Sequence, residues 1–279
     1  MLRIIVDSGS SIKQEEKEKY GVDIIPLRIM LGEKEYLDGI DLSLDVFYDA
    51  LINKKLFPKT SLPSLGDLDN LVQKYLNEGD EIVIVTISSG ISGTYSAIKS
   101  MYLDEEKILV IDSKTAVGGV RIIVNEIKKY SNQPLKVIEE KIQELIPRIQ
   151  VVAVPETLDY LHRGGRLNKM SYYLGSILSI KPLIGLYEGG VHVFSKVKGL
   201  AKAMKKMIES LINCDENYEI VPSYTYDKTN LEKMMEDTEP KYRKLMKVID
   251  NLDPAIACHW GPNAFGYIFV SKEKIQKSI

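Results

Sequence analysis

Serine and glycine residues gather in one short stretch that follows a predicted buried strand. The strand is expected over Glu81–Ile87, where Ile and Val are enriched. The next six residues, SSGISG at 88–93, supply three serines and two glycines, and a helix is predicted from Thr94 to Leu103. Backbone N–H groups at the positive start of a helix, beside hydroxyls, attract a phosphate or a carboxylate. Ser and Gly also dominate ordinary turns, so this stretch alone leaves a simple turn open.

Two common phosphate-binding patterns are absent from this loop, and their absence restricts the type of anion that it would bind. No Gly-Lys-Ser/Thr closes it as in a Walker phosphate loop, and the dinucleotide pattern G-x-G-x-x-G is absent from it. A loop with hydroxyls and no lysine favours a singly charged head group over a triphosphate.

Three further polar loops resemble this one, at residues 7–11, 60–64 and 112–115. Ligands of parallel sheets bind at the carboxyl ends of the strands, where such loops gather. Asp7 and Asp112 each end a strand without a paired base or a metal-ligand cluster, so we interpret them as residues that stabilise the loops.

The two halves of the chain predict different architectures. Strand, loop and helix repeat through the first half, with one strand expected over Val22–Ile29, which indicates a mostly parallel α/β domain. The second half has a hairpin at 182–197 around Gly189-Gly190, a buried helix expected over Tyr172–Ile180, and further helices. We therefore predict an α/β protein with two domains. The first (1–152) is a mostly parallel α/β domain, and the second (153–279) is an α+β domain with antiparallel strands.

Composition excludes several classes of function. The 279 residues are 44% hydrophobic and 27% charged with a net charge of −2, which gives no electrostatic case for nucleic acid. Two cysteines are too few for a disulfide framework, and no metal site or catalytic triad is predicted. No apolar run reaches transmembrane length, and a strand rather than a signal sequence is expected near the N-terminus. We expect a cytoplasmic protein without integral membrane association.

Seven segments in order resemble the DegV family. They are DSGSS at 7–11, TSLPS at 60–64, SSGISGTYSA at 88–97, IDSKTAVGG at 111–119, ETLDYLHRGGRL at 156–167, LGSILSIKPLI at 174–184 and HWGPNAFG at 259–266. Each motif alone is weak, but the ordered set spans nearly the whole chain and is specific.

The resemblance implies two α/β domains that hold a long-chain fatty acid in a buried pocket, with no cofactor. Family members, called FakB in bacteria that also have a fatty acid kinase, present the carboxylate of the bound acid to that separate kinase, which makes an acyl phosphate. The resemblance therefore implies a lipid-binding carrier rather than an enzyme, with the fatty acid and a fatty acid kinase subunit as its partners.

The same resemblance assigns the site residues. The carboxylate contacts of the family fall on Thr60, with Ser61 beside it, and on Ser92, with the amide of Gly93 as a further donor. His259 is also associated with the head group, and as a group that titrates near neutral pH it could act as a cationic partner. For Arg166, which closes the Gly-Gly-Arg motif, the resemblance implies kinase docking or charge balance, and we assign the neighbouring Arg163 to partner docking with it. Departures from the family pattern at Gly9, Ser11, Leu62 and Asn263 leave Thr60, Ser92 and His259 intact.

Two other functions remain open at this level. One is an enzyme that acts on a small ligand bearing a phosphate or carboxylate at the same loops. The other is a regulatory module that binds a partner through Arg163–Lys169. The sequence leaves open the chain length and unsaturation of the fatty acid, the oligomeric state, the identity of the kinase and the fate of the acyl phosphate.

Overall fold

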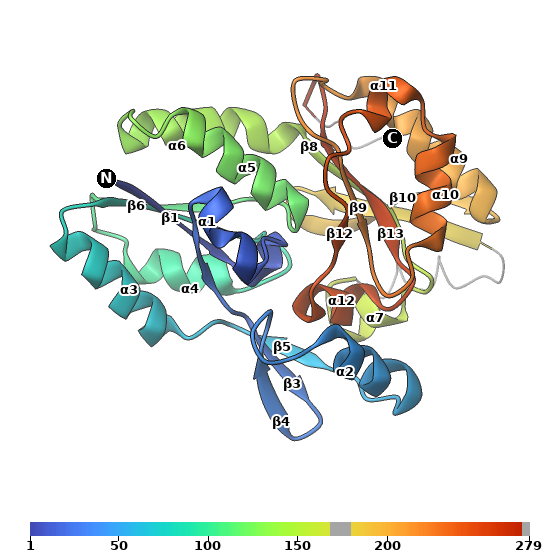
Figure 1. The fold of residues 1–279 in the computed structure, drawn as a ribbon, viewed down its shortest axis with the longest axis horizontal. Coiled ribbons are helices and arrows are strands. Elements are labelled where there is room, and N and C mark those ends of the chain that lie inside the picture. Colours follow the sequence, from blue (N-terminus) through green and yellow to red (C-terminus); the bar gives the residue numbers. More distant parts are fainter. Residues whose placement is uncertain (168–179, 275–279) are drawn as a thin grey trace. The chain divides into compact units, whose positions relative to one another are not determined.

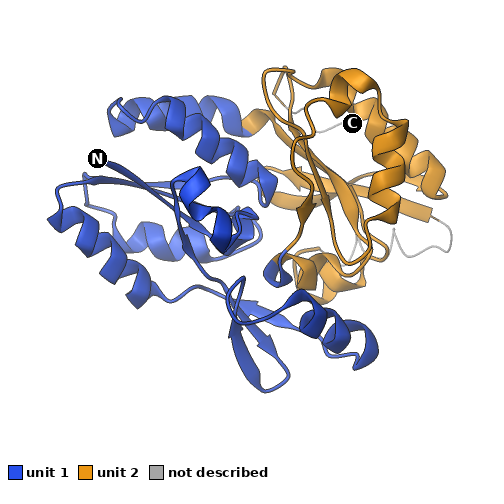
Figure 2. Ribbon diagram, in the orientation of Figure 1, with its two compact units in different colours: residues 1–146, 253–255 blue, residues 147–252, 256–279 orange. Residues whose placement is uncertain are grey.

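The computed structural model describes residues 1–167 and 180–274, which form two compact units (Figure 2). Unit 1 contains residues 1–146 and 253–255, and unit 2 contains 147–252 and 256–279. The domain boundary expected after residue 152 stays a prediction. The helix predicted over Tyr172–Ile180 lies outside the described residues, apart from Ile180 itself, which begins strand β9.

Unit 1 is built on a parallel sheet in the order β2-β1-β6-β7. Its strands are β1 (Leu2–Asp7), β2 (Asp23–Ile25), β6 (Glu81–Thr86) and β7 (Ile108–Asp112). Strand β6 lies between β1 and β7, so the loops that follow these three strands meet at one edge. The predicted parallel α/β architecture of this part of the chain is confirmed.

Helices cover both faces of this sheet (Figure 1). They are α3 (Leu65–Asn77) and α4 (Thr94–Met101) on one face, and α5 (Gly118–Lys129) and α6 (Leu135–Leu145) on the other. Alternate strand residues such as Ile82 and Ile84 join Leu68 and Ile98 in a fully buried cluster on the α3/α4 face. Alternation of this kind places the other half of each strand against α5 and α6.

A small antiparallel sheet accompanies the parallel one, in the order β4-β3-β5. Its strands are β3 (Arg28–Leu31), β4 (Lys34–Leu37) and β5 (Lys59–Ser61), with the short helices α1 (Lys17–Tyr20) and α2 (Leu44–Tyr48) and a π-helical turn at Asp49–Asn53 nearby in the sequence. The prediction of one strand over Val22–Ile29 is wrong, because β2 and β3 belong to different sheets. Pro26 has no N–H for a ladder, and the N–H of Leu27 donates to Ser8 Oγ instead.

Unit 2 is built on a six-stranded mixed sheet in the order β10-β9-β8-β13-β11-β12. The strands are β8 (Ile149–Val154), β9 (Ile180–Tyr187), β10 (Gly190–Lys198), β11 (Val221–Tyr224), β12 (Asp250–Asn251) and β13 (Phe265–Val270). All pairs are antiparallel except β11 with β12. The hairpin predicted around Gly189-Gly190 is confirmed as β9–β10, and the α+β character with antiparallel strands is confirmed with it.

Helices pack on this sheet through a core of aromatic and sulfur-containing side chains. The described α-helices that lie wholly in unit 2 are α7 (Asp159–Arg163), α9 (Leu200–Ser210), α10 (Thr229–Asp237) and α11 (Pro240–Arg243). Met204 and Met207 of α9 and Met234 of α10 pack with Tyr267 and Phe269 of β13, and all five are buried. A separate cluster of Leu158, Leu161, Leu167 and Ile184, with Trp260 against it, underlies α7.

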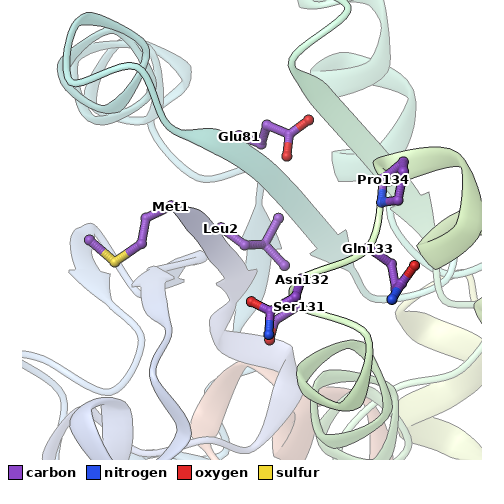
Figure 3. A pocket seen from close by; sticks show the side chains of 7 residues that line it. All are labelled: Met1, Leu2, Glu81, Ser131, Asn132, Gln133 and Pro134. Carbon is purple, nitrogen blue, oxygen red and sulfur yellow. The ribbon is translucent and has the colours of Figure 1, made fainter.

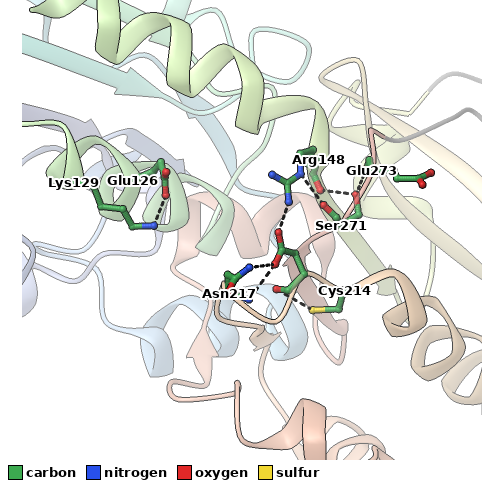
Figure 4. A network of polar contacts seen from close by, with 8 residues as sticks. Glu126, Lys129, Arg148, Cys214, Asn217, Ser271 and Glu273 are labelled. Atoms are coloured by element: carbon green, nitrogen blue, oxygen red, sulfur yellow. Dashed lines mark hydrogen bonds and ion pairs between the residues drawn. The ribbon is translucent and has the colours of Figure 1, made fainter. Parts of the chain in front are cut away.

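Arg148 joins the beginning of β8 to the end of β13 within unit 2 (Figure 4). Its Nε donates to the carbonyl of Ser271 at 2.8 Å, and its Nη2 forms an ion pair with Asp215. The same view includes a pair within α5 of unit 1, in which Lys129 Nζ lies 2.6 Å from Glu126 Oε2. The contacts of Arg148 tie the strand ends together, and the Glu126–Lys129 pair lies within one helix, so we interpret both as structural.

Helix α12 (Pro254–Trp260) has its first residues, Pro254 and Ala255, in unit 1 and the rest in unit 2. None of the helices in residues 1–167 and 180–274 combines the length and the apolar character needed to cross a membrane.

Candidate functional site

The loop at 88–93 is held from both sides by the neighbouring loops of unit 1. Asp7 Oδ2 accepts the N–H of Ile87 at 2.9 Å, and the N–H of Ser88 donates to the carbonyl of Thr115 at 2.8 Å. The N–H of Val117 in turn donates to the carbonyl of Gly9 at 2.8 Å. Three of the four loops that the sequence predicts at one edge of the parallel sheet are therefore hydrogen-bonded to one another.

Asp7 is a fully buried carboxylate at this edge. Besides Ile87, it accepts the N–H of Gly9 at 3.0 Å. Burial raises the pKa of Asp7 to about 7 although both hydrogen bonds act in the opposite direction. The contacts confirm Asp7 as a residue that stabilises the loops.

Asp112 and Lys114 fix the beginning of the serine-rich loop. Asp112 Oδ1 accepts the N–H of Ser89 at 3.0 Å, while Lys114 Nζ lies 2.7 Å from Asp112 Oδ2 and 3.0 Å from Ser89 Oγ. Burial tends to raise the pKa of Asp112, but hydrogen bonds from Lys114 and Ser89 outweigh it, and the pKa is lowered. Asp112 is confirmed as a stabilising residue, and Lys114 is its partner, which sequence reasoning missed.

Ser92 and Gly93 lie where the loop enters helix α4. The N–H of Ser92 donates to the carbonyl of Ser88, and Ser92 Oγ accepts the N–H of Thr94 at 3.3 Å. Ser92 Oγ also lies 2.9 Å from Thr94 Oγ1, and Thr94 is buried whereas Gly93 is exposed. When Thr94 donates in this pair, the Ser92 hydroxyl keeps its own hydrogen for an anion.

Thr60 and Ser61 belong to strand β5 rather than to a loop, because they pair with Ile29 and Arg28 of β3. The polar stretch at 60–64 therefore follows the small antiparallel sheet and not the parallel one. It still meets the serine-rich loop: a Cβ atom added to Gly93 would lie 3.6 Å from Leu62 Cδ2. Unit 1 thus brings the TSLPS segment against the Ser92–Gly93 turn.

His259 lies in unit 2, on helix α12, and packs against the Gly164 backbone. Burial first, and then the positive charge of Arg166, lower the pKa of His259 to about 4. The imidazole is therefore neutral at pH 7, and the expectation of a cationic partner is wrong for this environment. A neutral imidazole can still donate one hydrogen bond to a carboxylate.

The two arginines assigned to docking differ in their surroundings. Arg166 Nη1 donates to the carbonyl of Gly164, so its guanidinium is held at the glycine turn beside His259. Arg163 ends α7 and is exposed. Nearby, Tyr160 packs against Gly261, where a Cβ would lie 2.3 Å from the ring, and the φ of +74° at Gly261 independently favours glycine.

A separate hollow of about 560 Å³ opens at the other edge of the parallel sheet (Figure 3). Met1, Leu2 and Glu81 line it at the start of β1 and β6, together with residues 131–134 between α5 and α6. The hollow is open and its lining is mostly polar, and none of the predicted site residues borders it. Among the described residues, no group of three His, Cys, Asp or Glu side chains is placed to hold a metal ion.

Known proteins resemble this chain over nearly its whole length. The model of the DegV family, described as "Uncharacterised protein, DegV family", matches residues 1–272. A DegV domain-containing protein of Clostridium acetobutylicum is 33% identical over 291 residues, which cover 97% of this chain and 99% of the relative.

Two solved structures have the same fold over nearly their whole length. A fatty-acid-binding DegV family protein from Streptococcus agalactiae superposes with a TM-score of 0.87 at 28% identity, covering 98% of this chain and 99% of that one. A stearic-acid-binding protein from Eubacterium ventriosum gives a TM-score of 0.83 at 25% identity, with coverage of 98% and 99%. With the family model matching residues 1–272, the sequence and the fold agree, and this chain belongs to the DegV family.

Proposed function

We propose that this protein binds a long-chain fatty acid and presents its carboxylate to a separate fatty acid kinase, without chemistry of its own. Thr60, Ser61, Ser92 and the amide of Gly93 would contact the carboxylate, with His259 as a further partner. Arg163 and Arg166 would face the kinase. A cytoplasmic location is part of the same proposal.

The observation that carries this proposal is the meeting of the TSLPS segment with the Ser92–Gly93 turn in unit 1, at the start of α4. A hydroxyl and backbone N–H groups at a helix start suit a single carboxylate. Fatty acid binding by the relatives from S. agalactiae and E. ventriosum supports the choice of ligand.

The physical chemistry of a fatty acid fits such a modest head-group site. Burying roughly fourteen methylenes at about 0.8 kcal/mol each stabilises the complex by on the order of 11 kcal/mol before the entropy of association is subtracted. The tail therefore supplies the affinity, whereas the head group needs only enough donors to avoid an unpaired buried charge.

Mass spectrometry of the purified protein tests fatty acid binding directly. Native spectra are compared with spectra after denaturation and solvent extraction. We expect one fatty acid per chain, released on denaturation. A protein that is empty and stays empty when fatty acids are offered would contradict the proposal. Turnover of a small phosphate or carboxylate compound by the isolated protein would then favour the alternative, an enzyme at the same loops.

Two substitutions test the head-group assignment. Ser92→Ala and Thr60→Val remove one hydroxyl each, and we expect fatty acid affinity to fall about tenfold for each, the effect of one lost hydrogen bond to a charged group. Ser100→Ala is the matched control, because Ser100 Oγ donates only to the carbonyl of Ser96 on the exposed face of α4. Unchanged lipid content in both variants would show that the assignment is wrong.

The kinase step needs its own measurement. With a fatty acid kinase and ATP, we expect acyl phosphate only when this protein is present, and none from this protein with ATP alone. Arg163→Glu should weaken the complex with the kinase while leaving the bound fatty acid in place. Loss of fatty acid from this variant would assign Arg163 to the ligand instead.

A further inference from the structure

A second buried carboxylate in unit 1, Asp38, uses both of its oxygens to join distant parts of the chain. It follows β4, and its side chain is fully buried. Asp38 Oδ2 accepts from Ser8 Oγ at 2.7 Å, and Oδ1 accepts the N–H of Ala255 at 3.0 Å. These partners lie 30 and 217 residues away along the chain. Asp38 therefore connects the loop after β1 to the start of α12.

Through Ser8, Asp38 is connected to the serine-rich loop at 88–93. Ser8 Oγ also accepts the N–H of Leu27 at 3.0 Å, so the hydroxyl must donate its hydrogen to Asp38. Ser8 directly follows Asp7, whose carboxylate accepts the N–H of Ile87 immediately before the 88–93 loop. A shift of Ser8 would therefore be transmitted through Asp7 to the beginning of that loop.

The contact with Ala255 leads to His259. Ala255 and His259 are four residues apart on α12, which is about one helical turn. Residues 253–255 are the part of the later chain that belongs to unit 1, and Asp253 adds an ion pair with Lys13 there. The backbone N–H of Ala255 is one of the helix-start donors that no carbonyl within the helix can accept. Asp38 thus anchors the start of the helix that carries His259.

We propose that Asp38 is a positioning residue for the fatty acid head group, because its carboxylate holds, within unit 1, both the loop that leads to Ser92 and the first residues of the helix that carries His259. This inference rests on the proposed function. It assigns Asp38 no contact with the ligand: its effect passes through the groups that it holds.

Substitution by asparagine separates this role from simple packing. Asp38→Asn keeps the size of the side chain but leaves one acceptor oxygen for two donors, so either Ser8 or Ala255 loses its partner. Burial and the neighbouring Asp253 raise the pKa of Asp38 to about 7, so binding is measured at about pH 8, where the carboxylate is ionised.

The measurement compares a fatty acid with the methyl ester of the same chain. Both ligands bury the same tail, and only the acid presents a carboxylate. In Asp38→Asn we expect affinity for the acid to fall about tenfold while affinity for the ester changes less than twofold. An equal loss for both ligands would show a general packing role and overturn the inference, as would unchanged affinity for both.

The imidazole signals give a second readout. The chain has three histidines, so proton NMR can follow His259 against His192 as an internal reference. We expect Asp38→Asn to move the His259 signal and to leave that of His192 in place. An unchanged His259 signal would overturn the link through α12.

Two further variants serve as a control and as a second test. Asp23→Asn is the matched control, because Asp23 accepts from Tyr75 Oη at 2.7 Å in the same unit and holds no loop of the site. It should leave the ratio of acid to ester affinity unchanged. If Asp38→Asn fails to fold, Ser8→Ala tests the same chain of contacts, with an expected loss of about threefold for the acid alone.

The wild-type protein separates the two hypotheses. Wild-type protein that binds neither acid nor ester would refute the proposed function together with this inference. Wild-type protein that prefers the acid, with a preference that survives in Asp38→Asn and in Ser8→Ala, would refute the role of Asp38 alone.

Discussion

A Cβ atom on Gly164 would lie 2.3 Å from Nδ1 of His259 and 3.0 Å from its Cε1. The imidazole therefore packs directly on the backbone of the glycine turn, within unit 2. Gly164 has a φ of −71°, which any residue can adopt, so glycine is needed here for the space that its missing side chain leaves and not for its conformation. The Gly-Gly-Arg turn consequently sets the position of His259.

Gly164→Ala should displace the His259 ring and press on the carbonyl oxygen of Tyr160, which would lie 3.0 Å from the new Cβ. Alanine adopts the φ of Gly164 readily, so the effect comes from these contacts. We expect a loss of stability of about 1–3 kcal/mol from overpacking. If His259 contacts the head group, fatty acid affinity should fall about tenfold as well. Urea denaturation measures the first effect and a fluorescent fatty acid the second.

Gly66→Ala is the control for this glycine, since nothing lies within 4 Å of a Cβ at that position of α3. It should stabilise the protein slightly, by about 0.5–1 kcal/mol, because glycine is a poor residue inside a helix. Full fatty acid affinity in Gly164→Ala would separate the position of His259 from ligand binding.

The neutral His259 predicts a loss of stability in acid. Its folded pKa of about 4 lies below the unfolded value of 6.5. Between these values the unfolded chain binds a proton that the folded protein does not, so stability falls as the pH falls from 6.5 towards 4. His259→Gln lacks this proton, and its stability difference from wild type should shift in favour of the variant by about 1–2 kcal/mol between pH 7.5 and pH 5. Urea denaturation at both pH values measures this shift. The same difference in free energy of unfolding at pH 7.5 and pH 5 would contradict the burial of a neutral imidazole.

The raised pKa of Asp7 predicts the opposite dependence of stability on pH. Its folded pKa of about 7 lies above the unfolded value of 3.8, so the folded protein holds the extra proton between these values. The contribution of Asp7 to stability therefore falls as the pH rises from 3.8 to 7. Asp7→Asn weakens one of two backbone contacts and should be destabilised most at pH 5, with a smaller deficit at pH 8. Thermal unfolding at both pH values measures the difference, and a deficit that grows towards pH 8 would assign an ordinary pKa to Asp7.

Local signals in the sequence predicted the elements that frame the site. Strand β6 follows from the enrichment of Ile and Val, and α3 begins directly after Ser64, a residue typical of helix N-caps, whose Oγ accepts the N–H of Asp67. The turn around Gly189 also marks its hairpin in the sequence. These features depend on neighbours along the chain, which periodicity and capping residues report.

Features that depend on distant partners could not be predicted in the same way. The segment between β2 and β3 leaves the ladder at Pro26 and Leu27, and the N–H of Leu27 donates to Ser8, which lies 19 residues earlier. The burial of Asp38 against Ala255 has no signature in the sequence, because the two residues lie 217 positions apart. The charge state of His259 depends on burial and on Arg166, which lies 93 residues earlier in the chain (259 − 166).

Lys114 should determine how firmly the serine-rich loop is held. Lys114→Met removes the ammonium that lies 2.7 Å from Asp112 Oδ2 and 3.0 Å from Ser89 Oγ. The pair is partly exposed, so we expect a loss of global stability of only about 0.5–1 kcal/mol. The larger effect should be local, because Asp112 then holds the N–H of Ser89 without a fixed counter-charge. Amide hydrogen exchange at Ser89 and Gly90 should become several-fold faster, whereas Lys54→Met, which breaks an exposed pair with Asp49 in the same unit, should leave it unchanged. Equal exchange rates in wild type and Lys114→Met would show that the backbone contacts of Ser88 alone hold this loop.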